Sequence, residues 1–144
     1  MQISRRQIVI GLLLAVSIPN EAAGDKQVTI IDTGSTNRPG LEITVDANGT
    51  ARMESRGAEP QAIRLDTGLC QRFLRTVQAA TPLTDLPAAR CMKSVSFGSR
   101  LFVEYNGQRS PDISCPSQQD SRVEDLKKQA TELLGAARAA SRPK

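Results

Sequence analysis

The sequence predicts an α+β domain in which an antiparallel sheet of hairpins carries two helices, both packed on one of its faces. Two observations lead to this prediction. Several short segments alternate apolar and polar side chains and are joined by turn-forming residues, whereas two longer segments repeat apolar side chains with a helical period. The order of strands, helix, hairpin and helix is typical of α+β domains.

The strands before the first helix are predicted from β-branched residues and from two-residue alternation. Residues 28–32 are rich in β-branched side chains, and residues 41–46 alternate strictly between apolar and polar. A turn at Asp46-Ala47-Asn48-Gly49 leads into a returning strand at residues 50–55. Residues 62–65 are expected to add a further short strand to the same sheet.

Two helices are predicted from capping residues and apolar spacing. Asp66 or Thr67 caps the first helix, whose apolar side chains recur every four residues until the chain reaches Pro82. The second helix begins at about Ser121, where Ser121 and Glu124 have the spacing of a capping box. An apolar stripe along each helix is expected to face the sheet.

A hairpin is predicted between the two helices. Residues 94–97 and 101–105 are expected to be strand-like, with a bend at Gly98-Ser99 between them. Asn106-Gly107 is the strongest hairpin signal in the chain, because this dipeptide suits the positive φ angles of a two-residue turn. Pro111 either ends the returning strand or places it at the edge of the sheet.

Residues 1–24 have the features of a secretory signal peptide. Arg5 and Arg6 form a basic start, and an apolar run of about 11 residues follows at residues 8–18. Such a run is too short to cross the roughly 30 Å hydrocarbon core of a bilayer as a helix. The general secretory route is favoured over the twin-arginine route. The alternative interpretation is a short apolar segment buried in the fold.

Cleavage between Gly24 and Asp25 is expected, because small residues precede this bond. It would leave residues 25–144, or 144 − 24 = 120 residues, as a single α+β domain without a membrane span. The predicted localisation is therefore secreted or periplasmic.

Three cysteines fit such an oxidising compartment. Cys70 lies on an apolar helix face, while Cys91 and Cys115 lie in polar, loop-like segments and are the favoured pair. A geometric objection stands against that pair. If residues 106 and 107 form a two-residue hairpin turn, the residue numbers of each cross-strand pair add up to 106 + 107 = 213. Cys115 then lies opposite Gly98 and not opposite Cys91. The bridge then requires the chain to bend near Gly98 or to leave the ladder at Pro111.

Composition limits the classes of function. The formal net charge is +4 with both signs interspersed, and three Phe, one Tyr and no Trp give little aromatic surface for stacking bases. Nucleic acid is therefore not an expected partner. The chain contains no His, which removes Ser–His and Cys–His nucleophile pairs and histidine metal ligands. No metal site and no cofactor are expected.

Asp32-Thr33-Gly34-Ser35 follows two isoleucines and resembles the local signature of aspartic peptidases. In those enzymes two carboxylates share one proton and activate a water molecule. A chain of this length would have to be a dimeric, viral-type enzyme with Asp32 as the catalytic residue of each subunit. The glycine-rich flap and the later apolar-apolar-Gly segment of such enzymes are missing from the sequence. A strand that ends in a turn, with local side-chain hydrogen bonds, is the favoured interpretation.

Three segments resemble a family of small exported bacterial proteins of unassigned function. They are TGSTNRPG at residues 33–40, CMKSVSFG at residues 91–98 and SPDISC at residues 110–115. The resemblance supports Cys91 and Cys115 as the disulfide pair, because both lie in these segments. It also speaks against a peptidase, since members of that family are not known as peptidases.

The order of strand, helix, Leu86-Pro87, hairpin and helix is also similar to that of emfourin-type inhibitors of bacterial metallopeptidases. The resulting expectation is an exported, non-enzymatic domain that binds an extracytoplasmic protein or an envelope component, with a peptidase as one candidate partner. The alternatives are the aspartic peptidase and an envelope-associated structural protein. Two exposed segments are expected to contact the partner, namely the hairpin tip at Asn106-Gly107 and the loop after the first strand. The loop residues are Ser35, Thr36, Asn37 and Arg38.

Overall fold

The computed structural model describes residues 26–117 and 119–142. The proposed signal peptide, residues 1–24, and its cleavage position between Gly24 and Asp25 lie outside these residues. Within the described part of the chain, no helix has both the length and the apolar character needed to cross a membrane.

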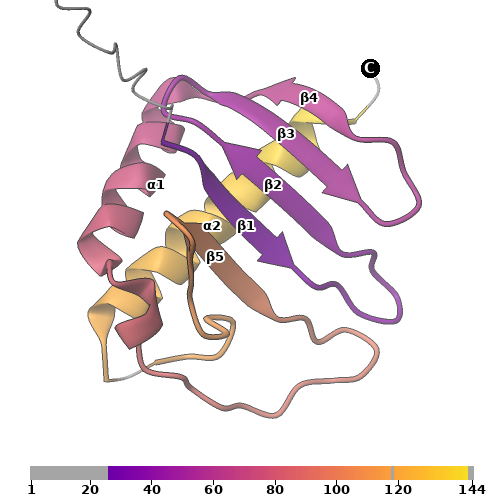
Figure 1. The fold of residues 1–144 in the computed structure, drawn as a ribbon. Coiled ribbons are helices and arrows are strands. Elements are labelled where there is room, and N and C mark those ends of the chain that lie inside the picture. Colours follow the sequence, from indigo (N-terminus) through magenta and orange to yellow (C-terminus); the bar gives the residue numbers. More distant parts are fainter. Residues whose placement is uncertain (1–25, 118, 143–144) are drawn as a thin grey trace, which may run out of the picture.

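A six-stranded antiparallel sheet forms one layer of the domain (Figure 1). Its strand order is β4-β3-β2-β1-β5-β6, so neighbours in the first half of the sheet are consecutive hairpins. The chain leaves the sheet after β4 and returns on the other side of β1, where β5 pairs with it. The strands are β1 (Val28–Asp32), β2 (Leu41–Val45), β3 (Thr50–Ser55), β4 (Gln61–Arg64), β5 (Leu101–Tyr105) and β6 (Gln108–Arg109).

Two helices form the second layer and cover one face of the sheet (Figure 1). They are α1 (Thr67–Ala80) and α2 (Ser121–Ala140), which pack against each other, and a short 3-10 helix, η1 (Leu83–Asp85), follows α1. This arrangement confirms the predicted α+β fold with both helices on one face.

The core lies between the two layers. Alternate residues of β1, β2 and β5 point toward the helices and are buried, and the opposite face of the sheet carries partly or fully exposed side chains. The helices contribute their apolar stripes, in which Phe73 and Leu126 are completely buried. Cys70 is buried in the same core as a free thiol, as its place on the helix predicts. Leu83 and Leu86 close the core beyond the end of α1.

The caps of the helices are partly as predicted. Asp66 caps α1 by accepting a hydrogen bond from the Leu69 N–H at 2.8 Å. The predicted capping box of Ser121 with Glu124 is wrong, because Asp120 is the N-cap of α2 and its carboxylate accepts from the N–H of the second helical residue. Glu124 instead accepts a hydrogen bond from the backbone N–H of Ser117 at 2.5 Å, which fastens the preceding loop to the helix.

The predicted hairpin turn is present. Asn106 and Gly107 have φ angles of 50° and 73°, the left-handed values that an Asn-Gly turn requires. The residue numbers of the pairs Glu104↔Arg109 and Tyr105↔Gln108 each add up to 213, which is the register that a turn at residues 106–107 predicts. The ladder comprises two pairs and β6 ends at Arg109, after which the N–H groups of Ser110 and Ile113 still donate to the Val103 and Leu101 carbonyls of β5 at 2.9 Å.

The predicted strand at residues 94–97 is wrong. This segment forms a turn, closed by a hydrogen bond of 2.6 Å from the Gly98 N–H to the Ser94 carbonyl. Strand pairing is not available to it, because the β1–β5 ladder ends at the Asp32↔Leu101 pair and β1 then turns away. A side chain at position 98 would place its Cβ 2.4 Å from the Ser94 oxygen, so the turn requires glycine there.

Candidate functional site

Asp32 ends β1 and is almost completely buried, with 5% of its side chain exposed. Its carboxylate accepts three hydrogen bonds: from the Gly34 N–H at 3.0 Å, from Arg38 at 3.0 Å and from Arg138 at 2.8 Å. Arg138 lies near the end of α2. The carboxylate therefore fastens the loop after β1 to the last helix.

The charge of Asp32 is well stabilised in this position. Burial by itself would raise the pKa of the carboxyl group, but the hydrogen bonds from Gly34 and Arg138 and the charge of Arg38 together lower it below its ordinary value. In an aspartic peptidase, by contrast, two carboxylates face each other and share a proton. The groups that touch Asp32 here are cationic or neutral donors, and they compensate a buried anion.

The sequence predicts that the loop after β1 binds a partner. Thr36, Asn37 and Arg38 are exposed, whereas Ser35 is half-buried. The Ser35 N–H donates to the Arg38 carbonyl at 2.8 Å, which closes the loop on itself. The hairpin tip at Asn106-Gly107 is exposed too, but it lies at the opposite end of β1, because Tyr105 pairs with the first residue of that strand. The two predicted binding segments are therefore not one surface.

The loop after β1 instead lies beside residues 90–100, here called the apolar loop. The Thr36 hydroxyl donates to the Val95 carbonyl at 3.1 Å, and the Asn37 N–H donates to the Ser96 carbonyl at 3.3 Å. Arg38 also donates to the Ser99 hydroxyl at 2.9 Å. These contacts join two segments about sixty positions apart in the sequence into one continuous surface.

The apolar loop carries large apolar side chains in solvent. The exposed fractions are 102% for Met92, 85% for Val95 and 74% for Phe97, and no other large apolar side chain among the described residues is comparably exposed. Scattered exposed apolar residues are common, but three within six positions of one loop make this loop a candidate interaction surface. Sequence reasoning missed this surface because it assigned residues 94–97 to a strand.

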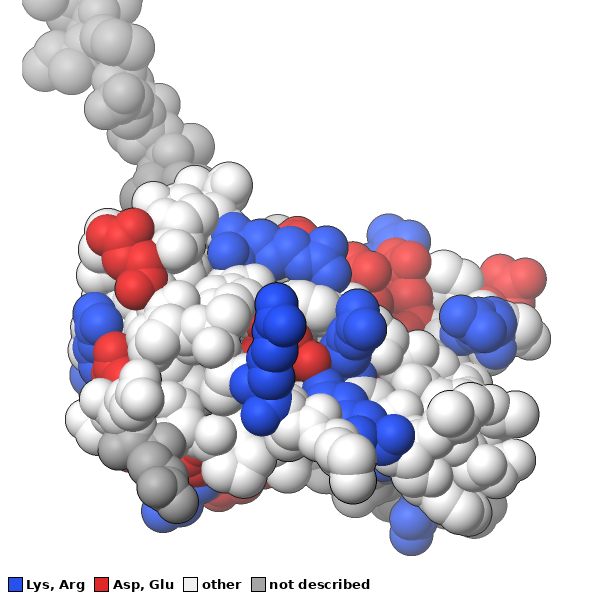
Figure 2. Space-filling view, turned by 90° about the horizontal axis from the view of Figure 1, so that it is seen from below, with Lys and Arg blue, Asp and Glu red and all other residues white. Residues whose placement is uncertain are grey.

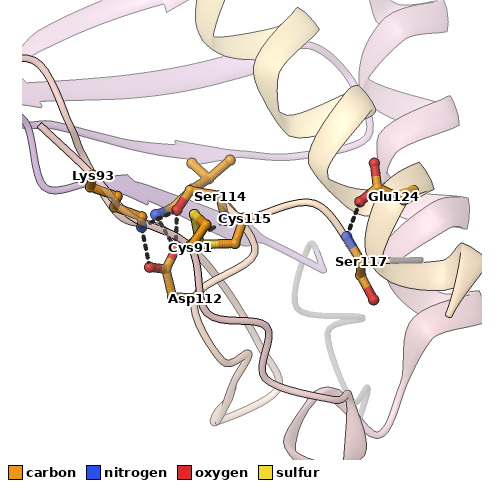
Figure 3. The surroundings of a disulfide bond; sticks show 8 residues. Cys91, Lys93, Asp112, Ser114, Cys115, Ser117 and Glu124 are labelled. Atoms are coloured by element: carbon orange, nitrogen blue, oxygen red, sulfur yellow. Dashed lines mark hydrogen bonds and ion pairs between the residues drawn. A yellow bond between two sulfur atoms is a disulfide. The ribbon is translucent and has the colours of Figure 1, made fainter. Parts of the chain in front are cut away.

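A disulfide and an ion pair hold the apolar loop in place (Figure 3). The sulfur atoms of Cys91 and Cys115, the pair favoured from the sequence, are 2.08 Å apart. The chain meets the geometric objection by leaving the β5–β6 ladder before it reaches Cys115. Beside the disulfide, the ammonium group of Lys93 pairs with the Asp112 carboxylate and donates to the Ser114 hydroxyl.

Asp112 is the centre of this clamp. Its carboxylate also accepts from the Leu101 N–H at 3.1 Å and from the Ser114 N–H at 3.0 Å. Burial alone would raise its pKa, but the hydrogen bonds from Lys93, Ser114 and Leu101 outweigh burial and lower the pKa to about 2. The carboxylate is thus charged at every ordinary pH.

Ser114 and Lys93 together could suggest a serine nucleophile with a lysine base. The direction of the hydrogen bonds argues against that chemistry. Lys93 donates to a charged carboxylate, and the Ser114 hydroxyl donates its own proton to Asp112 at 2.5 Å. A base has to accept the serine proton, whereas this lysine serves as a donor. The cluster is a structural clamp for the loop.

The surroundings of the apolar loop are basic. A hollow of about 460 Å³ beside it is lined by three basic side chains, Arg90, Lys93 and Arg100, against one acidic side chain, Asp112, with Phe102 and the disulfide among its other walls. Figure 2 views the molecule from the side of this loop and shows Lys and Arg side chains gathered around partly covered acidic groups. The guanidinium of Arg109 stacks 4.3 Å from the centre of the Phe102 ring.

Within residues 26–117 and 119–142, no group of three or more acidic or cysteine side chains is arranged to hold a metal ion.

Neither a protein-family model nor a curated protein sequence matches this chain. The resemblances to small exported bacterial proteins and to emfourin-type inhibitors therefore stay predictions. What the fold and the surface define is a two-layer α+β domain with a clamped, basic loop that presents apolar side chains to solvent.

Proposed function

We propose that this chain is an exported, non-enzymatic domain that binds an extracytoplasmic protein or an envelope component. The binding surface is the apolar loop, residues 90–100, together with the neighbouring loop at residues 33–40. The observation that carries the proposal is the exposure of Met92, Val95 and Phe97 on a loop that is clamped at both ends.

Burial of these side chains supplies the driving force. Transferring a Val, Met or Phe side chain from water into an apolar contact contributes roughly 1.5 to 3 kcal/mol. A loop that is already ordered loses little conformational entropy when it binds, so most of this free energy is available for affinity. The disulfide and the Lys93–Asp112 ion pair supply that order before any partner arrives.

The non-enzymatic part of the proposal rests on the state of the candidate catalytic groups. Asp32 is enclosed by two arginines and a backbone N–H, and Ser114 donates its proton to a carboxylate. The export part rests on the signal-like residues 1–24 and on a disulfide that fits an oxidising compartment.

Competition for isolated cell envelopes tests the proposal. Labelled residues 25–144 are bound to envelopes of the producing organism, and unlabelled protein is added as competitor. Unlabelled wild type is expected to displace the label. The triple variant Met92→Ser, Val95→Ser, Phe97→Ser should compete at least about tenfold less well, because it removes the apolar contact.

A conservative variant provides the control. Met92→Leu, Val95→Ile, Phe97→Leu keeps the apolar area and should compete within about twofold of wild type. All three positions are exposed, so both variants should retain the thermal unfolding curve of the parent. Equal competition by the serine variant and by wild type would reject the proposed surface.

A further inference from the structure

We infer that the apolar loop docks onto the surface of an anionic phospholipid bilayer. This inference rests on the proposed function and names the partner of the same surface. The apolar side chains enter the boundary between headgroups and acyl chains, and the basic side chains around them lie against lipid phosphates.

The charge of the loop favours an anionic partner. The sequence from Asp85 to Glu104 contains no acidic residue between those two, but it contains Arg90, Lys93 and Arg100. Lys93 is neutralised by Asp112, whereas neither Arg90 nor Arg100 forms an ion pair with any of the residues described. Two uncompensated cations therefore flank the apolar side chains on both sides.

The arrangement of apolar and basic groups matches an interface between water and lipid. The side chains of Met92, Val95 and Phe97 are each largely exposed to solvent. The apolar loop that carries them runs along the outer edge of the domain (Figure 1). A protein partner would need cavities shaped for each of these side chains, whereas fluid acyl chains accommodate projecting groups in any arrangement. Apolar groups flanked by Lys and Arg are the pattern by which peripheral proteins bind anionic membranes.

The contacts that hold the apolar loop against the neighbouring loop are consistent with membrane binding. Hydrogen bonds from Thr36 and Asn37 hold the backbone carbonyls of Val95 and Ser96, and Arg38 donates to the side-chain hydroxyl of Ser99. The backbone that carries Val95 therefore cannot move away from the neighbouring loop without breaking these bonds. Arg38 lies on the same surface and adds a further cation, although Asp32 partly compensates it.

Co-sedimentation with lipid vesicles tests the inference. Residues 25–144 are mixed with vesicles of phosphatidylcholine alone, or with vesicles in which phosphatidylglycerol replaces part of it. We expect binding to the anionic vesicles, weaker binding as salt is added, and little binding to phosphatidylcholine alone. Equal binding to both kinds of vesicle, or binding to neither, would overturn the inference.

Charge variants test whether the flanking arginines make the contact. Arg90→Gln with Arg100→Gln should weaken binding to anionic vesicles by about fivefold for each charge removed. The control is Arg64→Gln with Arg75→Gln, which removes the same net charge from β4 and α1 and should change binding by less than about twofold. If both pairs weaken binding equally, attraction is a property of net charge and not of this loop.

A single tryptophan reports insertion directly, because the chain contains none. The variant Phe97→Trp should show a blue shift of its emission on anionic vesicles and quenching by lipids brominated in the acyl chains. Gln71→Trp, on the exposed face of α1, should show neither change. Sedimentation without a blue shift at position 97 would contradict insertion of the loop.

The two proposals fail in different ways. If the serine variant loses envelope competition while wild type ignores anionic vesicles, the partner is a protein and only the lipid inference is wrong. If wild type binds neither envelopes nor vesicles, the proposed function is wrong as well.

Discussion

Two carboxylates, Asp32 and Asp112, determine how the loops of this domain are held. Asp32 ends β1 and Asp112 lies three residues after β6, and each accepts hydrogen bonds from backbone N–H groups and from basic side chains. An aspartate that ends a strand is easily taken for a catalytic group in sequence, because the motif does not show which side chains will surround it. Arg138 is 106 positions from Asp32 in the sequence, and no local sequence pattern predicts that these two residues are in contact.

Lowering the pH should weaken the clamp at Asp112. Its pKa is about 2 in the folded protein against an ordinary value of 3.8, so the unfolded chain takes up the proton first as pH falls. The stabilisation, on the order of 2 kcal/mol, is present above pH 4 and is lost between about pH 4 and pH 2. Urea unfolding across this pH range measures it.

The variant Asp112→Asn isolates this effect. It should be less stable than wild type at neutral pH and should lose part of the pH dependence between about pH 4 and pH 2. Asp125→Asn, at an exposed position of α2, serves as the control and should leave the wild-type curve unchanged. An unchanged curve for Asp112→Asn would show that the ion pair with Lys93 contributes no stability.

Replacing Asp32 should affect stability and not catalysis. Asp32→Asn removes the charge that compensates Arg38 and Arg138, and we expect a loss of about 2 kcal/mol in the free energy of unfolding. At acid pH, neither the wild type nor the variant should digest denatured protein. Pepstatin-sensitive cleavage that disappears in Asp32→Asn would instead establish the aspartic peptidase.

Among the helices and strands, the sequence correctly predicted those features that depend on neighbouring residues alone. The alternation at residues 41–46, the Asp66 cap and the Asn-Gly turn each act over a few residues, and each is present. The strand prediction for residues 94–97 is wrong because this segment, although its composition is strand-like, has no neighbouring strand to pair with. The apolar surface was missed for the same reason, since a strand would have buried half of its side chains.

The disulfide is the element-scale feature on which the apolar loop depends. Cys91 and Cys115 are 24 positions apart, and closing a loop of this length stabilises a fold by about 3 kcal/mol in the chain-entropy account. The double variant Cys91→Ser, Cys115→Ser should therefore melt at a lower temperature. It should also bind envelopes more weakly, because the loop then has to be ordered on binding.

Reductant supplies the comparison. It should shift the melting of wild type toward that of the double variant and should leave the double variant unchanged, since Cys70 is a buried thiol in both. Identical melting of oxidised wild type and the double variant would show that the bridge does not stabilise the fold.

The packed core of this molecule supports two neighbouring loops, on which we place the proposed binding surface. The sheet, the two helices and their core hold the ends of β1 and β5 together, and the two loops that emerge there lie side by side. That juxtaposition depends on the β1–β5 pairing across about seventy positions of sequence, so sequence patterns alone could not supply it. The sequence therefore proposes Ser35, Thr36, Asn37 and Arg38 as a binding loop without the residues 90–100 that lie beside them.

Site-specific photocrosslinking in living cells tests whether the apolar loop contacts a partner. A photoreactive amino acid is placed at Val95 on the apolar loop, or at Gln71 on the exposed face of α1 as the matched position. We predict abundant adducts, to lipid or to an envelope protein, from position 95 and few from position 71. Equal yields from both positions, or adducts from position 71 alone, would contradict it.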